Sequence, residues 1–472
     1  MRLGAWWRSV GSTRWRVLLL FALVAGGALR VAWVAHAGAP PPFATDPEAY
    51  LLQGETIARG HGYTNPLVDI ENAARAREHL GPLPRQPASF YPPGYPAFVA
   101  AVLWVVWHTP IPDGDPVRAV GYVQALLGVL TILGVYALAR RAFDPRVGVV
   151  AATIVAFYPN LVTTTATLQL ETVFAFLTVA TALALLAVTT AETPSAKMLV
   201  GAGALVGGVA LVRPTVGLLL VAFGVTRGLM RRPWKETVRA FVIAVVAMCA
   251  VVAPWTIRNE LRLHAFVPLS TGIGPTICMA RNPAATGGLN TDIMARECSP
   301  HPRRGSLAQQ DVAMNRYATH LAIRWVEQHP LSELHMWWVK TKLSFRRDTS
   351  GLQEFAPHMA LGSLRLANDF SNGVADVVLA LAAIGAVLVA RRKEAGGAFI
   401  LAAAIAMCAV PILLFGDPRY RVPAEPFLAI LCSVALVYGW SWRAARSASR
   451  SPRVIASSSA RMRVRSSSLE SS

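Results

Sequence analysis

Charged side chains are scarce in this sequence. They make up 15% of its 472 residues, and 54% of the residues are hydrophobic, whereas about 25% of a soluble globular domain is charged. The deficit is concentrated in long blocks, since the only Asp, Glu, Lys or Arg between positions 148 and 191 is Glu171. A helix crosses the hydrocarbon core with about 20 apolar residues, so this block is long enough for two crossings. The composition predicts an all-α polytopic membrane protein.

Cysteine is also scarce, with five residues and no CxxC pair of the kind that binds zinc. Cys249, Cys408 and Cys432 lie in apolar blocks, where a thiol usually serves as a small packing residue. Cys278 and Cys298 lie in a polar segment that we place outside the membrane, where disulfides persist. We expect these two to form a bridge. The ten histidines show no metal-ligand spacing such as HExxH, so none is assigned to a metal.

Acidic residues are outnumbered, with 26 Asp and Glu against 45 Lys and Arg, for a formal charge of +19. The arginines flank apolar blocks, which is typical of cytoplasmic loops that meet anionic lipid. No nucleic-acid partner is expected, because a recognition fold has no room between the blocks.

About ten transmembrane helices are expected, of which the two around Arg213 are short. They lie near residues 17–35, 117–139, 147–166, 172–188, 198–212, 214–225, 238–254, 373–390, 398–415 and 422–442.

Loop charges orient these helices. With a cytoplasmic N-terminus (1–16), four of the five inside segments are rich in Lys and Arg, and an even number of spans returns the basic tail to the cytoplasm. The bundle then runs over 17–255 with a first outside loop at 36–116. An extracytoplasmic segment at 256–372, C-terminal transmembrane helices at 373–442 and a disordered basic cytoplasmic tail at 443–472 follow.

Three further segments bear on the topology, and the first two of them allow two interpretations. Residues 35–37 (AHA) resemble a signal-peptidase site, but the apolar run before them is long for a signal, so we prefer a retained helix. Residues 95–107 are apolar but short for a crossing, and suit an interfacial or re-entrant helix. Residues 321–345 suit a helix bound at the membrane interface.

Asp46 follows the first predicted span, in the stretch TDPEAY. An Asp before Pro is a common helix cap, and this explains the residue without any catalytic role. Capping does not preclude catalysis, because one oxygen can cap while the other faces a cleft. Helical spacing would place Tyr50 on the same face as Asp46.

Glu171 interrupts an apolar block, where an ionised carboxylate is costly unless it reaches water or a partner. It is either a solvated residue at a turn between spans or a functional residue. Under the predicted topology Glu171 and Asp46 lie on the same side of the membrane. Two carboxylates in one pocket can supply a general base and a metal ligand.

Four arginines on that side are candidates for binding an anion: Arg213, Arg258, Arg419 and Arg421. Guanidinium groups bind phosphate oxygens bidentately and stay charged at any useful pH. In an extended turn, the side chains of Arg419 and Arg421 would point the same way. A salt bridge with Asp417, or snorkelling to lipid headgroups, is the alternative explanation.

Six stretches, in order, resemble the GT-C superfamily of membrane glycosyltransferases, in the branch of protein O-mannosyltransferase-like enzymes and the lipid A aminoarabinose transferase. They are residues 45–50 (TDPEAY), 58–63 (ARGHGY), 91–96 (YPPGYP), 170–174 (LETVF), 254–259 (PWTIRN) and 419–423 (RYRVP).

The resemblance implies a GT-C bundle with surface-lying helices in the first outside loop. It implies an outward-facing enzyme that moves sugar from a polyprenyl-phosphate donor to a glycan, lipid or protein acceptor. Asp46 would be the catalytic acidic residue that activates the acceptor hydroxyl or amine, and Glu171 would match a second acidic residue that can help to bind a divalent metal. Arg419, Arg421 and Arg258 would hold the lipid phosphate. Many relatives have two adjacent acids in this loop, whereas Pro follows Asp46 here, so Glu48 is the alternative base.

These acids and arginines suit glycosyl transfer from a phosphate donor, because the fixed charge of the arginines stabilises the departing phosphate. A transporter or lipid flippase is the second hypothesis, which would predict broken mid-membrane spans and repeated halves; the sequence shows no internal repeat. A non-catalytic scaffold or receptor that binds through 256–372 is the third.

Overall fold

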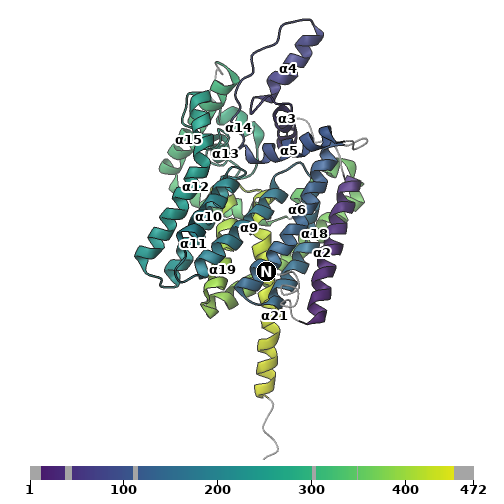
Figure 1. Cartoon of the computed structure of the whole chain (residues 1–472), viewed down its shortest axis with the longest axis vertical. Coiled ribbons are helices and arrows are strands. Elements are labelled where there is room, and N and C mark those ends of the chain that lie inside the picture. Colours follow the sequence, from purple (N-terminus) through teal and green to yellow (C-terminus); the bar gives the residue numbers. More distant parts are fainter. Residues whose placement is uncertain are drawn as a thin grey trace, which may run out of the picture.

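The computed structural model describes residues 12–37, 45–109, 115–299, 305–347, 349–353 and 355–450. Within these ranges the ordered elements are helices, and no strand is formed (Figure 1). Seven helices are long and apolar enough to cross a membrane, and a bent pair makes a possible eighth span. The predicted class, an all-α multi-pass membrane protein, is confirmed.

The seven long candidate spans cover seven of the ten predicted blocks. Five of them are single helices: α2 (Thr13–Ala37), α6 (Pro116–Ala142), α9 (Glu171–Thr190), α12 (Trp234–Leu263) and α18 (Leu361–Arg392). The sixth, Ala395–Leu413, comprises α19 (Ala395–Cys408) and α20 (Val410–Leu413). The seventh, Pro418–Gly439, comprises η4 (Pro418–Ala424) and the start of α21 (Glu425–Arg450).

The remaining three blocks are the bent pair and two short helices. The bent pair is α7 (Pro145–Phe157) with α8 (Pro159–Thr163) and η1 (Thr164–Ala166), which meet at 60°. The short helices are α10 (Ala196–Ala210) and α11 (Leu218–Leu229), which is preceded by η2 (Pro214–Gly217). Arg213 and Pro214 separate the two, because proline lacks the N–H that a continuing helix requires.

The bend between α7 and α8 has a partner that sequence reasoning missed. Pro159 cannot donate to the carbonyl of Val155, so α7 ends there with free acceptors. Arg30, buried within α2, donates to the carbonyl oxygens of Val155 (3.0 Å) and Ala156 (2.8 Å). A cation at a helix C-terminus is electrostatically favourable. Arg30 therefore caps a broken span inside the bundle.

Three helices occupy the predicted first outside loop: α3 (Asp46–Ala58), α4 (Pro66–Arg77) and α5 (Gly94–His108). They gather at one end of the bundle, with α4 outermost (Figure 1). The apolar stretch at 95–107 forms the 15-residue helix α5, which is short for a crossing, as expected.

The polar segment is also helical, with α13 (Ile273–Cys278), α14 (Thr291–Glu297), α15 (Leu307–Gln328), α16 (Pro330–Phe345), α17 (Ser350–Gln353) and η3 (Ala356–His358). The stretch expected to form one interfacial helix at 321–345 is divided, because α15 ends at Gln328 and Pro330 starts α16.

The predicted termini extend past the described part of the chain. Residues 443–450 continue α21 as helix, whereas 451–472 of the predicted disordered tail, and 1–11 of the predicted cytoplasmic N-terminus, lie outside the described residues.

Candidate active site

A cavity of about 550 Å³ lies at the bundle end that carries α3 and α5. Its walls come from segments far apart in the sequence: α3, the loop before α5, η2, α13–α15 and the turn before α21. Five predicted site residues line it, namely Asp46, Glu48, Tyr50, Arg213 and Arg419.

A chain of ion pairs joins four of the predicted residues, which we call the cavity cluster: Asp46, Glu171, Arg213 and Arg419. Arg419 Nη1 lies 2.9 Å from Asp46 Oδ2, and Arg419 Nε lies 2.9 Å from Glu171 Oε1. Arg213 Nη2 lies 3.0 Å from the same Glu171 oxygen. Arg419 thus bridges two carboxylates that are 125 residues apart in sequence.

Asp46 is the first residue of α3, and Thr45 occupies the cap position. Its carboxylate accepts a hydrogen bond from the Tyr91 hydroxyl at 2.7 Å as well as from Arg419. Tyr50 lies one helical turn further on the same side of α3, and its ring packs against Tyr91 with centroids 4.7 Å apart. The carboxylate therefore points to the cavity.

The pKa of the Asp46 carboxyl is lowered from its ordinary value of 3.8. Removal from water raises this pKa, but the Arg419 guanidinium and the hydrogen bond from Tyr91 together outweigh that effect. Burial and the neighbouring Asp46 charge raise the pKa of Tyr91 well above 10.0, so the phenol remains a donor. Asp46 is consequently an anion throughout the physiological pH range.

Glu171 lies beneath the cavity and is not among the residues that line it. Its side chain is 0% exposed, so it is not the solvated turn residue that the alternative interpretation required. As the first residue of α9, its charge also meets the positive end of the helix dipole. Its position suits a group that holds Arg213 and Arg419 in place.

The donor set was tested against the divalent metal that the resemblance implies. Across the described residues, no group of three or more His, Cys, Asp or Glu side chains is arranged to hold a metal ion. Both oxygens of Asp46 accept hydrogen bonds, and Glu171 Oε1 already meets two guanidinium groups. Tyr91 and Arg419 thus occupy both oxygens of Asp46, and only Glu171 Oε2 of this carboxylate pair is without a hydrogen-bond partner; one oxygen is too few to hold a metal ion, so the arrangement does not fit one.

Arg421 differs from Arg419 in its surroundings. The extended turn expected here is the 3₁₀ helix η4, in which residues two apart point in different directions. Arg421 is 1% exposed, donates to the carbonyl of Ser344 at 3.3 Å and lies 3.9 Å from Glu425, which in turn accepts a hydrogen bond from Asn160. Arg421 does not line the cavity; it anchors η4 to α16 and α21.

Arg258 also lies away from the cavity lining. One guanidinium nitrogen donates to the carbonyl of Ala88 at 2.8 Å and another to that of Tyr63, and the group lies over the Trp255 ring. Arg258 therefore ties α12 to the first outside loop and closes one side of the site.

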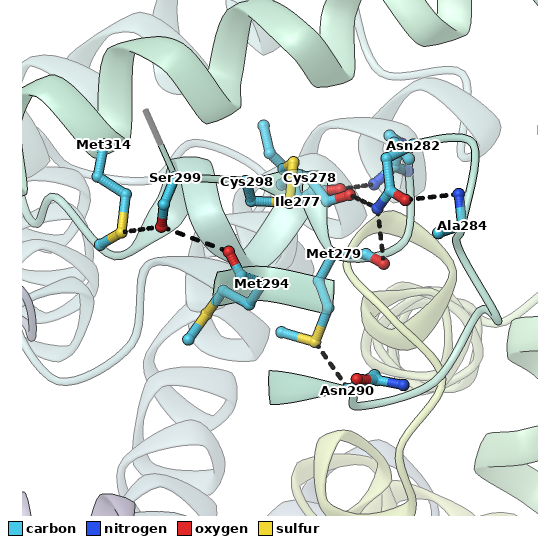
Figure 2. Close-up of a disulfide and its surroundings, with 11 residues drawn as sticks. Ile277, Cys278, Met279, Asn282, Ala284, Asn290, Met294, Cys298, Ser299 and Met314 are labelled. Carbon is cyan, nitrogen blue, oxygen red and sulfur yellow. Dashed lines mark hydrogen bonds between the residues drawn. A yellow bond between two sulfur atoms is a disulfide. The ribbon is translucent and has the colours of Figure 1, made fainter. Parts of the chain in front are cut away.

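The expected disulfide between Cys278 and Cys298 is confirmed, with Cα atoms 6.0 Å apart. Figure 2 shows it beside Met279 and Met294, two residues that line the cavity. Met279 follows Cys278 directly, and the amide of Cys298 donates to the carbonyl of Met294. The bridge therefore supports one wall of the cavity.

A second buried ion cluster, missed by sequence reasoning, lies behind the Arg419 turn. Glu333 Oε1 accepts from Arg281 at 2.8 Å, Lys340 at 3.2 Å and Trp337 at 3.0 Å. We call Arg281, Glu333 and Lys340 the bracing cluster. Burial, with the repulsion of Arg281, lowers the pKa of Lys340 to about 8.

The bracing cluster supports the segment of the chain that leads to Arg419. Arg281 donates to the carbonyl of Leu414 and Lys340 to that of Ile412. Gly416 packs directly on α16, because a Cβ there would lie 2.7 Å from the Lys340 carbonyl oxygen. The one sequence signal for this cluster is a Glu and a Lys seven residues apart, two turns along a single helix face.

Comparison with known proteins agrees with the motifs. Residues 92–257 match the family described as Dolichyl-phosphate-mannose-protein mannosyltransferase. This stretch contains the LETVF motif and most of the YPPGYP and PWTIRN motifs. The predicted resemblance to GT-C glycosyltransferases is thereby confirmed. No curated protein sequence matches the chain.

Solved structures with a similar course of the chain include the following two. One is the archaeal oligosaccharyltransferase AglB from Archaeoglobus fulgidus in complex with an inhibitory peptide and a dolichol-phosphate (15% identity, TM-score 0.47, 93% of this chain and 52% of that one). Another is ArnT from Cupriavidus metallidurans bound to undecaprenyl phosphate (16% identity, TM-score 0.38, 91% and 79%). The present chain spans about half the length of the oligosaccharyltransferase.

Proposed function

We propose that this chain, which resembles the GT-C glycosyltransferases and matches the mannosyltransferase family over residues 92–257, is a membrane glycosyltransferase. It moves a sugar from a polyprenyl-phosphate donor to an extracytoplasmic acceptor, with inversion at the anomeric carbon. The observation that carries the proposal is the cavity in which Asp46 and Arg419 meet at 2.9 Å, although 373 positions separate them in sequence.

Asp46 is proposed as the general base. The acceptor oxygen or nitrogen attacks the anomeric carbon while its proton passes to a carboxylate oxygen of Asp46. The bond between the anomeric carbon and the phosphate oxygen breaks, and its electron pair stays on that oxygen. With one base and a good leaving group, a single displacement suffices, and this inverts the carbon.

Arg419 and Arg213 supply the positive charge for the leaving phosphate. Both residues line the cavity, where low water content strengthens the field of their guanidinium groups. Glu171 holds both in position, so they need no reorganisation when charge develops. Arg421 and Arg258, also predicted as phosphate ligands, are proposed instead to position η4 and α12.

An extracytoplasmic site is supported by the direction of the helices that begin at the cavity cluster. Helix α9 starts at Glu171, and η2 with α11 and η4 with α21 start beside Arg213 and Arg419. All three run away from the cavity. Two of their far ends meet segments rich in Lys and Arg, at 227–239 and after 442, as expected on the cytoplasmic side. Anionic lipid is the proposed partner of those segments.

Metal dependence is tested directly with a chelator. Because two arginines already neutralise the two carboxylates of the cavity cluster, we expect transfer to persist in excess EDTA. A loss of transfer that added Mg²⁺, Mn²⁺ or Zn²⁺ restores would show that a metal is required.

The proposal is tested with Asp46→Asn in cells that lack the wild-type protein. Mass spectrometry of envelope glycans and polyprenyl-phosphate sugars is expected to show an accumulated donor and a missing sugar residue. Wild type restores the glycan, and Asp46→Asn does not, at equal membrane abundance.

Glu48→Gln is the matched control, because Glu48 also lines the cavity and is the alternative base. Restoration by Glu48→Gln and failure by Asp46→Asn would assign the base to Asp46, and the reverse would assign it to Glu48. Unchanged glycans and donors in the deletion strain would refute the glycosyltransferase.

A further inference from the structure

An apolar groove of about 900 Å³ lies along the membrane-spanning part of the bundle, separate from the candidate active site. Its walls are α11 and α19, which pack against each other, and the last turn of α18. It extends along α11 from Leu218, which follows η2, to Arg231, just past the end of the helix. In Figure 1, α19 lies at the end of the bundle away from α3 and α5. We call this space the α11–α19 groove.

The groove is open to the side and lined by apolar side chains. On α11, Val221, Val225 and Leu229 share one helix face and are 50%, 49% and 66% exposed. The facing side of α19 carries small side chains, among them Ala402 and Ala406, which leave the volume open. Because α19 belongs to a candidate membrane span, we expect this exposed apolar surface to face lipid tails.

The length of the groove matches one leaflet of a bilayer. Helix α11 has 12 residues and is therefore about 18 Å long, which compares with about 15 Å for half of the hydrocarbon core. An acyl chain that lies along α11 therefore crosses one leaflet and places its headgroup at the end of the groove.

Two cations stand at that end. The charged residues in the lining are Arg231, which follows α11, and Lys393, which follows α18, and both are exposed. Each has a φ of 53°, a left-handed conformation that usually goes to glycine at the end of a helix. Glu394 follows Lys393 but is not part of the lining. An apolar groove one leaflet long with two cations at its end is complementary to both parts of an anionic lipid.

We propose that the α11–α19 groove binds one anionic glycerophospholipid of the cytoplasmic leaflet. Its acyl chains lie along α11 and α19, and its phosphate accepts hydrogen bonds from Arg231 and Lys393. This deepens the lipid contact proposed for 227–239, because it replaces diffuse attraction with a single site that also uses α18 and α19. It rests on the orientation given in the proposed function and does not require sugar transfer.

The groove lies between helices that lead to the cavity cluster. Helix α11 follows η2 and Arg213, and α19 leads through α20 to η4 and Arg419. A ligand that binds the folded chain stabilises it, so a lipid held between α11 and α19 stabilises the packing of these two helices. We expect phosphatidylglycerol to raise the unfolding midpoint of the wild-type chain in detergent.

The test compares two lipids with the same acyl chains, anionic phosphatidylglycerol and zwitterionic phosphatidylcholine. Native mass spectrometry of the purified, delipidated full chain in detergent gives the two dissociation constants. We expect phosphatidylglycerol to bind about 10-fold more tightly, since its net charge is met by two cations. The double variant Arg231→Gln, Lys393→Gln is expected to bind both lipids equally.

The double variant Lys235→Gln, Arg391→Gln is the matched control. It removes the same two charges, and both positions are exposed and outside the lining. We expect it to keep the wild-type preference. An equal loss of preference in both double variants would show diffuse attraction by the basic segments and overturn the site.

A second pair of variants tests whether the acyl chains occupy the groove. Ala402→Phe fills it, and we expect phosphatidylglycerol to bind about 10-fold more weakly because acyl carbons are displaced. Ala402→Leu should give a smaller change in the same direction. Ala250→Phe is the control, because Ala250 is exposed on the candidate span α12 and lies outside the lining. Wild-type binding by both Ala402 variants would refute the proposal.

Competition with undecaprenyl phosphate identifies the lipid class. If this lipid displaces phosphatidylglycerol from the wild-type chain at equal concentration, the groove takes polyprenyl phosphates and the assignment to a glycerophospholipid is wrong.

Transfer assays separate the groove from the proposed function. If wild type transfers sugar and shows no preference for phosphatidylglycerol, the groove assignment is wrong and the glycosyltransferase stands. If wild type transfers no sugar but binds phosphatidylglycerol through Arg231 and Lys393, the groove assignment stands and the proposed function is wrong.

Discussion

The cavity cluster and the bracing cluster are built from the same residue types but differ in access. In both, a buried carboxylate meets two cations: Glu171 with Arg213 and Arg419, and Glu333 with Arg281 and Lys340. Two arginines of the cavity cluster line the cavity of about 550 Å³, whereas no member of the bracing cluster lines that cavity. Buried charge alone therefore does not identify a functional site in this protein.

The cations of the two clusters can also be compared by their hydrogen-bond partners. In the bracing cluster the cations also donate hydrogen bonds to the main-chain carbonyls of Leu414 and Ile412. In the cavity cluster Arg213 Nη1 has no hydrogen-bond partner in the protein and is shielded from solvent, and in the bracing cluster the same holds for Glu333 Oε2. The two clusters therefore differ in their place relative to the cavity and not in how completely their polar atoms are paired.

Arg419→Lys is expected to have the largest effect, because a lysine cannot contact both Asp46 and Glu171 as the guanidinium does. We expect kcat to fall about 100-fold or more, as when one preorganised donor to a developing oxyanion is removed. Arg281→Lys, the equivalent change in the bracing cluster, should leave kcat within about 3-fold, since only support is altered. A comparable fall in kcat for both variants would erase the distinction.

Glu333→Gln is expected to reduce stability without changing the chemistry. Removing the carboxylate leaves Arg281 and Lys340 buried without a counter-charge, which costs about 3 kcal/mol. Thermal unfolding in detergent should show a lower midpoint, while kcat at low temperature stays near wild type. The matched Glu171→Gln should lower both. Loss of kcat in folded Glu333→Gln would place this cluster in the chemistry.

The disulfide is a covalent support of the cavity wall and should have a smaller effect. Replacing Cys278 and Cys298 by serine opens a bridge with a sequence separation of 20 and should cost about 2 kcal/mol. Because Met279 and Met294 adjoin the bridge, we expect a higher acceptor KM with kcat retained. Reducing agent should reproduce the effect on wild type and leave the double variant unchanged.

The smallest effect is the pH dependence of the two clusters. The Lys340 pKa falls from 10.5 to about 8 in the folded chain, so between these pH values the unfolded chain binds more protons. Stability from this group therefore rises from about pH 8 to pH 10. The unfolding midpoint of wild type relative to Lys340→Met should rise over that range. A falling difference would contradict the lowered pKa.

Asp46 should show no such dependence near neutrality. Its pKa lies below 3.8, so kcat/KM should carry no limb from this group between pH 5 and 8. An acid limb near pH 6 in the wild-type profile that persists in Glu48→Gln would contradict the lowered pKa of Asp46.

Local patterns were informative wherever the physical cause was local. Apolar runs marked the helices because bilayer thickness sets their length, and Pro and Gly marked their breaks. The spacing of Asp46 and Tyr50 placed them on one side of α3. The different directions of Arg419 and Arg421 were missed, because an extended turn was assumed where Pro418 starts a 3₁₀ helix.

Composition and motif order alone determined that this chain is a multi-pass helical membrane protein with acids and arginines available at one end of the bundle. Tertiary structure decided which of them meet: Arg419 with Asp46 and Glu171, Arg421 with Glu425, Arg30 with the end of α7. The physical reason is that a buried charge is tolerated only with a partner. Except for Arg421 and Glu425, these partners lie more than 100 residues apart in sequence and meet only through helix packing.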